Sequence, residues 1–283
     1  MIRERVLQLG ADRALNGLWC SPDGEIEAGS ASRCLVLFWN AGLIHRVGPN
    51  RLFVQMARDL AARGVPSCRF DVSGLGDSAY RESVPGRRAP GEVAEVMDGM
   101  EAFGYRDFIL VGLCSGADEA HAIAVADERV RGVVHLDGYG ERTAGYYLHF
   151  YGQRLLRPRS WLGAMRSGWT LLKRLAGKVL GKPLLNRGEL VVFERDFPTR
   201  ETFREQLREL VRRRTRLFYV YTGGVSEYYC YSGQFQEMLR EVDLCGCVNT
   251  AHFFAADHLY SDPQVRKTMI REVGQWVART AAS

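Results

Sequence analysis

Six short apolar runs are spaced along the chain. Each is roughly four to eight residues long and apolar almost throughout, a pattern typical of strands that are buried on both faces of a parallel sheet. The runs lie at residues 34–39, 67–72, 108–113, 130–136, 217–221 and 248–254. We therefore predict a mainly parallel β-sheet built from these segments.

Amphipathic segments fill the spaces between the apolar runs. Apolar residues recur at helical spacing in residues 51–63, 91–103, 117–126 and 263–278. Strands and helices that alternate in this way are joined by right-handed crossovers, which place helices on both faces of the sheet. The predicted fold class is therefore α/β, with a mostly parallel central sheet. Residues 1–22 lack a clear helical pattern, so we expect them to supply antiparallel edge strands.

One connection is far longer than an ordinary link between a helix and a strand. About eighty residues separate Leu136 from Leu217. We divide the chain into a core, residues 1–138 and 215–283, and an inserted helical lid or cap, residues 139–214. Within the insertion, apolar residues recur at helical spacing with Arg and Lys between them. They are Trp161, Met165, Trp169, Leu172, Ala176 and Val179. This pattern predicts an amphipathic lid helix over the carboxyl edge of the sheet, with peripheral membrane contact as the alternative.

The composition is that of an ordinary globular protein. The 283 residues are 46% hydrophobic and 25% charged, which is enough to bury one large core. The first residues show no signal-peptide pattern, and no apolar run approaches the roughly 18 residues that a membrane span needs. We therefore expect a soluble, cytoplasmic protein with no stable membrane insertion.

Cysteine usage indicates reduced thiols. The chain has seven cysteines, an odd number, without the spacing of a small disulfide framework. Cys245 and Cys247 form a C-x-C pair that lacks a second pair and lacks histidines at zinc-finger spacing. No metal site is predicted.

A nucleophile position follows the apolar run that ends at Leu113. Residues 112–116 read GLCSG and lead into a helical pattern. This is the spacing of the G-x-S-x-G elbow, a strained strand-to-helix turn whose flanking glycines avoid collisions with neighbouring backbone. By that spacing Cys114, and not Ser115, is the candidate nucleophile. A helix N-terminus and a nearby imidazole would favour its thiolate form.

The base and its orienting acid are expected at the same edge of the sheet. His258 follows the last predicted strand and precedes the last helix, so we predict it as the base, whereas His252 lies within the strand and is expected to be structural. Glu227, just past the strand at residues 217–221, is the predicted acid. Asp137, at the end of the strand at residues 130–136, is the alternative.

An acyl-transfer site also needs backbone donors for the negative charge of a tetrahedral intermediate. By position, the amide of Ser115 supplies one donor. The loop after the strand at residues 34–39 supplies the other, from either Ala41 or Gly42, and the sequence leaves that choice open.

These motifs together resemble the α/β-hydrolase superfamily. The resemblance spans nearly the whole chain and includes the GLCSG elbow, a stretch at residues 70–78 similar to D-x-R-G-x-G-x-S, and the order nucleophile, acid, histidine. More narrowly, the chain resembles the cysteine-nucleophile hydrolases associated with bacterial exosortase systems. The segments that carry this likeness are residues 46–48, 112–114, 146–161, 223–229 and 256–258. The chain departs from the common pattern at the nucleophile, at Val72 and Ser73, and at Asn40 and Ala41.

A thiolate attacks thioesters and activated esters readily, and the acyl-cysteine that results is itself a thioester. We therefore expect an acyl-transfer enzyme with a Cys-His-Glu triad, either a hydrolase or thioesterase or an acyltransferase. Other cysteine-bearing proteins of this superfamily include both hydrolases and N-acyltransferases, so the nucleophile does not choose between them. The alternative is a non-catalytic α/β-hydrolase-like protein that binds an acyl carrier or acyl ligand.

The charge distribution bears on the partner. The net charge is +5, but residues 141–216 carry about 18 Lys and Arg against about 7 Asp and Glu. This basic segment suits a small-molecule acyl substrate presented on coenzyme A or on an acidic acyl carrier protein, or it is simply a solvated face. Gly74 and Gly76 lack the context of a dinucleotide loop, so no cofactor is predicted. No nucleic-acid-binding module is apparent, and no nucleic-acid partner is expected.

Overall fold

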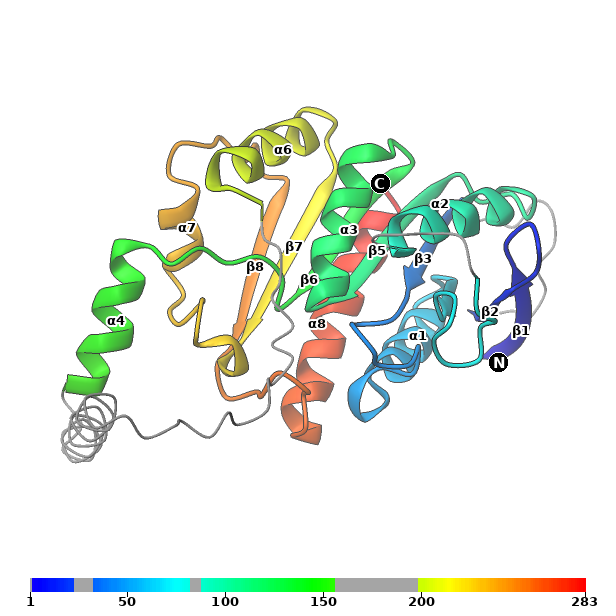
Figure 1. Cartoon of the computed structure of the whole chain (residues 1–283), viewed down its shortest axis with the longest axis horizontal. Coiled ribbons are helices and arrows are strands. Elements are labelled where there is room, and N and C mark those ends of the chain that lie inside the picture. Colours follow the sequence, from blue (N-terminus) through cyan, green and yellow to red (C-terminus); the bar gives the residue numbers. More distant parts are fainter. Residues whose placement is uncertain (1, 23–32, 82–87, 156–197) are drawn as a thin grey trace, which may run out of the picture.

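The computed structural model describes residues 2–22, 33–81, 88–155 and 198–283. An eight-stranded sheet runs through the molecule in the order β1-β2-β4-β3-β5-β6-β7-β8 (Figure 1). The strands are Arg3–Leu9 (β1), Leu15–Ser21 (β2), Cys34–Phe38 (β3), Ser67–Phe70 (β4), Asp107–Leu113 (β5), Val130–Leu136 (β6), Arg216–Thr222 (β7) and Val248–Phe253 (β8). Strands β3 to β8 pair in parallel, whereas β1 with β2 and β2 with β4 pair antiparallel. The predicted parallel sheet with an antiparallel edge is confirmed.

Helices cover both faces of this sheet, as the strand-helix alternation predicts. The helices are Leu52–Ala62 (α1), Arg88–Glu101 (α2), Ser115–Ala126 (α3), Ala144–Leu155 (α4), Arg200–Arg212 (α6), Gln234–Met238 (α7) and Pro263–Ala281 (α8), with 3-10 turns at Pro49–Arg51 (η1) and Gly223–Val225 (η2). Buried residues of α1 and α8 share one core cluster, and those of α2, α3 and α6 share another. The sheet lies between these two layers (Figure 1).

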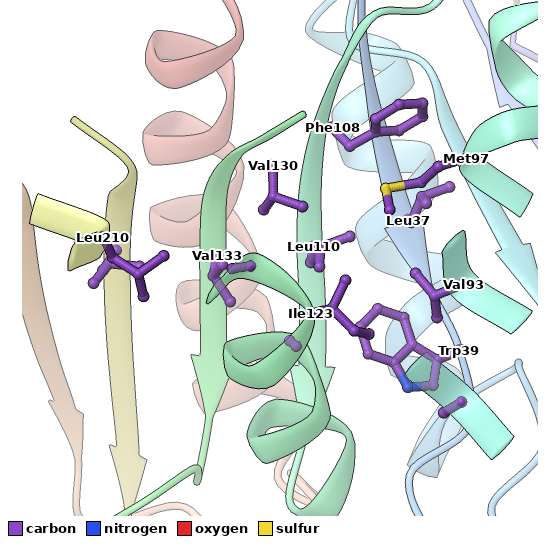
Figure 2. Close-up of a cluster of buried hydrophobic side chains, with 14 of the residues drawn as sticks. Leu37, Trp39, Val93, Met97, Phe108, Leu110, Ile123, Val130, Val133 and Leu210 are labelled. Atoms are coloured by element: carbon purple, nitrogen blue, oxygen red, sulfur yellow. The ribbon is translucent and has the colours of Figure 1, made fainter. Parts of the chain in front are cut away.

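Alternation along the central strand explains why its sequence is apolar throughout. Phe108 and Leu110 of β5 belong to the cluster beneath α2 and α3, whereas Ile109 and Val111 belong to the cluster beneath α1 and α8. Successive side chains of a strand point to opposite faces. Figure 2 shows the first cluster, where Leu110 lies with Val93 of α2. The apolar residues at successive positions of β5 therefore fill both cores.

The two described helices of the predicted insertion, α4 and α6, lie differently relative to the sheet. Helix α4 extends away from the sheet, whereas α6 lies along it (Figure 1). Phe203, Leu207 and Leu210 of α6 are buried in the same cluster as the apolar residues of α3. The predicted lid helix from Trp161 to Val179 lies outside the described residues and stays a prediction.

Two further features follow from the described residues. None of the helices among them combines the length and the apolar character needed to cross a membrane. None of the seven cysteines, all of which lie in the described residues, forms a disulfide bond.

Two histidines are buried between α3, α6 and the sheet. His121 of α3 and His135 of β6 have ring centroids 5.7 Å apart, and His135 stacks on Tyr219 at 4.1 Å. Burial lowers the pKa of His121 to about 4. Burial also lowers the pKa of His135 well below its ordinary value. Both imidazoles are therefore neutral in the folded protein.

This burial predicts a loss of stability in mild acid. As pH falls below about 6.5, the unfolded chain binds protons that the folded protein excludes, so the free energy of unfolding falls by up to about 1.4 kcal/mol per pH unit for each histidine. Urea denaturation of the wild type and of His135→Phe from pH 7.5 to pH 5 measures this slope. The dependence of the unfolding free energy on pH should be weaker in the variant by the contribution of one histidine. An unchanged slope would contradict the assignment.

Candidate active site

The turn after β5 holds Cys114 in a strained backbone conformation. Its φ is 56° and its ψ is −121°, a region that residues other than glycine rarely occupy. The amide of Cys114 donates to the carbonyl of Leu136 at 2.9 Å, which ties the turn to the end of β6. A Cβ on Gly112 would lie 2.2 Å from the carbonyl oxygen of Gly116. Gly112 of the GLCSG motif is therefore required by backbone contact across the turn.

The turn places the Cys114 thiol at the N-terminus of α3. Cys114 is the N-cap residue of this helix, and its side chain is half-buried. The free amides and the dipole at a helix N-terminus favour a negative charge on a nearby group. The thiol is thus accessible and lies where a thiolate is stabilised.

The imidazole of His258 lies between Cys114 and a buried carboxylate. Its Nδ1 donates to Oδ2 of Asp137 at 2.8 Å, and the ring also forms a hydrogen bond with the Cys114 side chain. The bonds to Asp137 and to Cys114 raise the pKa of His258 to about 9, against the opposing effect of burial. The histidine therefore carries a proton at neutral pH.

The carboxylate of Asp137 is fixed from several sides. Asp137 directly follows β6, is completely buried and has a left-handed backbone with φ 52°. Its Oδ1 accepts from the amide of Thr222 and its Oδ2 from the hydroxyl of Thr222, both at 2.7 Å. A buried carboxylate needs such partners. They leave Oδ2 aimed at His258.

Glu227, predicted as the orienting acid, does not occupy that position. Its side chain is exposed, and its backbone carbonyl accepts hydrogen bonds from Arg142 at 2.9 Å and from Tyr146 at 2.5 Å. The reason is the 3-10 turn Gly223–Val225, which immediately follows β7 and packs against the histidine loop. A Cβ on Gly224 would lie 2.2 Å from the amide nitrogen of His258. The structure therefore places the alternative, Asp137, and not Glu227, against His258.

His252 is bonded away from the thiol. Its Nε2 lies 2.8 Å from the hydroxyl of Tyr229, and burial lowers the pKa of its imidazole. This arrangement fits the structural role expected from its place within the last strand.

The loop predicted to supply an oxyanion donor lies against the start of α3. The amide of Gly42 donates to the hydroxyl of Ser115 at 3.0 Å, and Ala41 pairs with Ile44 in an isolated β-bridge. A Cβ on Gly116 would lie 3.0 Å from the carbonyl oxygen of Asn40, so this glycine permits the close approach. The structure thus brings Ala41, Gly42 and Ser115 together beside Cys114.

A buried polar network, which the sequence pattern did not reveal, holds this loop. The Asn40 side chain donates to Oδ1 of Asp71 at 2.8 Å and accepts from the amide of Val72 at 2.7 Å. Asp71 is completely buried, and its carboxylate also binds the backbone amide and the guanidinium of Arg46. Asn40 thus joins this loop to the segment that directly follows β4. The signal available in the sequence was the polar residue directly after an apolar strand.

One cluster has the donor atoms of a metal site but already contains a cation. Side-chain atoms of His45, Asp71 and Asp77 lie within 4.8 Å of one another. The guanidinium of Arg46 forms ion pairs with both carboxylates. This arginine therefore cancels one of the two negative charges that would attract a metal ion and already binds both carboxylates, so the residues do not fit a metal.

Comparison with known proteins identifies the fold. No family model matches the sequence, and no curated protein matches it. Among solved structures, the esterase domain of a Rhodothermus marinus protein is 14% identical, with 99% of both chains covered and a TM-score of 0.54. The α/β hydrolase GrgF from a Penicillium species is 13% identical, with 100% of both chains covered and a TM-score of 0.55. Proline iminopeptidase from Mycobacterium smegmatis is 13% identical, with 99% of both chains covered and a TM-score of 0.52. Taken with the strand order and the elbow at Cys114, these likenesses show that the chain has the α/β-hydrolase fold.

Proposed function

We propose that this protein is an acyl-transfer enzyme whose triad is Cys114, His258 and Asp137. The observation that carries the proposal is the position of the His258 imidazole, bonded on one side to the buried Asp137 carboxylate and on the other to the Cys114 side chain. A nucleophile, a base and a group that orients the base are the parts that covalent acyl transfer needs. The esterases and hydrolases of similar fold support a reaction of this class.

The raised pKa of His258 defines how the pair works. With the imidazole protonated at neutral pH, the proton of the Cys114 thiol can reside on the histidine, which leaves a thiolate beside an imidazolium. The thiolate is the nucleophilic form of cysteine. Asp137 keeps the imidazole in one orientation and stabilises its positive charge.

The chemistry proceeds in two balanced steps. The Cys114 sulfur attacks the carbonyl carbon of an acyl thioester, the bond from that carbon to the donor's sulfur breaks, and the departing thiolate takes the proton from His258. His258 then removes a proton from water or from an acceptor, which attacks the acyl-cysteine and releases the acyl group. The Cys114 thiolate and the protonated His258 are thereby restored.

Backbone amides near the thiol suit the negative oxygen of each tetrahedral intermediate. We assign one donor to the amide of Ser115 and the other to the loop of Ala41 and Gly42. In the free protein the Gly42 amide donates to the Ser115 hydroxyl. Turning that hydroxyl away would free the Gly42 amide for the oxyanion, so Gly42 is the preferred second donor.

The substrate class follows from the nucleophile. Transfer from one thioester to another is nearly neutral in energy, whereas acylation of a thiol by an amide is unfavourable. We therefore propose a small-molecule acyl substrate carried on coenzyme A or on an acidic acyl carrier protein. The resemblance to hydrolases of exosortase systems is compatible with this class of acyl-group chemistry.

Product analysis tests the proposal and separates hydrolysis from transfer. Purified protein is incubated with acyl-coenzyme A donors of several chain lengths, with and without an added amine or alcohol acceptor. We expect free thiol to be released, with free acid as the product of a hydrolase and acylated acceptor as the product of a transferase. If no donor is consumed across the panel, the protein is instead a binding member of the fold.

A further inference from the structure

A cavity lies at the opposite edge of the sheet from Cys114. It has a volume of about 750 Å³, and its lining includes the first residues of three parallel strands, Cys34 of β3, Asp107 of β5 and Arg216 of β7. Cys114 and Asp137 follow the other ends of β5 and β6. Strand β5 has seven residues and so separates the two sites by about 20 Å at roughly 3.3 Å per residue. This cavity is therefore distinct from the candidate active site.

The cavity is lined by positive charge. Five arginines line it, with Asp107 the single acidic side chain among its lining residues. They are Arg33, Arg131, Arg213, Arg214 and Arg216. Arg213, Arg214 and Arg216 lie within four residues of the chain, and the fold brings the distant Arg33 and Arg131 beside them.

Two of these arginines have partners within the protein. Arg131 donates to Asp107 at 2.7 Å. The guanidinium of Arg213 donates to the carbonyls of Ala124 and Val125 at the end of α3. The hydrogen bonds of these two side chains therefore join neighbouring segments of the cavity wall.

The other three are not neutralised by the described parts of the chain. No described carboxylate lies within ion-pair distance of Arg33, Arg214 or Arg216, and all three are exposed. Arg216 donates to the carbonyl of Gly246 at 3.2 Å, which leaves its charge unpaired. The three positive charges therefore repel one another. An anion in the cavity would remove that repulsion.

Arg214 occupies a position where glycine is usual. It follows the end of α6 with φ 62°, and its amide donates to the carbonyl of Val211. Residues that end a helix in the left-handed conformation are most often glycine. The arginine adds no helix-ending advantage there, but it adds a cation at the cavity.

We propose that this cavity binds a small anion that carries two or more phosphate groups. Its volume falls within the roughly 300 to 1,000 Å³ of small-molecule sites. Guanidinium groups bind phosphate oxygens through paired, charge-assisted hydrogen bonds. Three unpaired arginines exceed what one monoanion requires, which favours a diphosphate or triphosphate group. The proposal does not depend on the acyl-transfer reaction.

Isothermal titration calorimetry with inorganic pyrophosphate tests this site. The variant Arg214→Gly removes a cation where the backbone suits glycine, so its stability should be equal to or above that of the wild type. We expect its affinity for pyrophosphate to fall about tenfold, the usual effect of losing one charge-assisted bond. Arg216→Gln should weaken binding similarly. Orthophosphate should bind more weakly than pyrophosphate to every form.

The matched control is Arg208→Gln, an exposed arginine of α6 that does not line the cavity. It should leave the affinity for pyrophosphate unchanged. Equal weakening by Arg208→Gln would mean that pyrophosphate binds by overall charge alone, which overturns the proposal. The proposal would also be overturned if pyrophosphate showed no measurable binding, or if an acidic peptide bound at this cavity and pyrophosphate did not.

Discussion

Replacement of Cys114 by alanine should abolish acyl transfer. Without the sulfur no acyl-enzyme forms, and the loss of a triad nucleophile costs roughly 10⁴-fold or more in rate. Alanine carries the same Cβ as cysteine, so the strained φ of 56° at this position is no worse in the variant. The rate of thiol release from acyl-coenzyme A, measured under single-turnover conditions, gives the effect.

Two controls accompany this variant. Cys245→Ala removes an exposed thiol at the other edge of the sheet and should retain the wild-type rate. Thermal unfolding should show the same midpoint for Cys114→Ala and the wild type. Normal turnover by Cys114→Ala would remove the sulfur from the mechanism.

Replacement of Asp137 by asparagine should have the second-largest effect, a loss of roughly 10³- to 10⁴-fold in kcat/KM. An amide group in place of the carboxylate cannot accept all the hydrogen bonds from Thr222 and His258 and permits the wrong tautomer of the imidazole. Glu227→Gln, which alters an exposed side chain, should change kcat/KM by less than about twofold. If Glu227→Gln were the more damaging substitution, the acid would have to be reassigned.

The pH profile of the same variants reports on the histidine. His258 has a pKa raised to about 9, so the thiolate-imidazolium pair loses its proton as pH rises through that value. The activity of the wild type should therefore decline above about pH 9. In Asp137→Asn the first cause of the raised pKa is absent, and the decline should begin at lower pH.

Burial on both faces made the strands predictable from the sequence. Strands such as β3, Cys34–Phe38, are apolar at every position, and the structure reproduces the bounds of the predicted strands to within about two residues. The elbow was equally clear, because Gly112 is required by a contact with Gly116 within the same five-residue segment. Features fixed by local backbone geometry were thus visible in the sequence.

The choice of acid was not visible, because it depends on contacts between distant segments. Glu227 and Asp137 both follow a parallel strand, and only the 3-10 turn at Gly223–Val225 and the bonds from Thr222 decide which carboxylate faces His258. The arginine-lined cavity was hidden for the same reason. Its charges come from positions as far apart as Arg33 and Arg216, which only the order of strands in the sheet brings together.

The most direct test of the central claim is the mass of the enzyme after a brief reaction with an acyl thioester. Protein mixed with acyl-coenzyme A is quenched in acid, and the adduct is located by peptide mass mapping of the wild type, Cys114→Ala and Ser115→Ala. We predict one acyl group on Cys114, present in Ser115→Ala and absent from Cys114→Ala. Turnover without an adduct on Cys114, or an acyl group that persists in Cys114→Ala, would contradict the account.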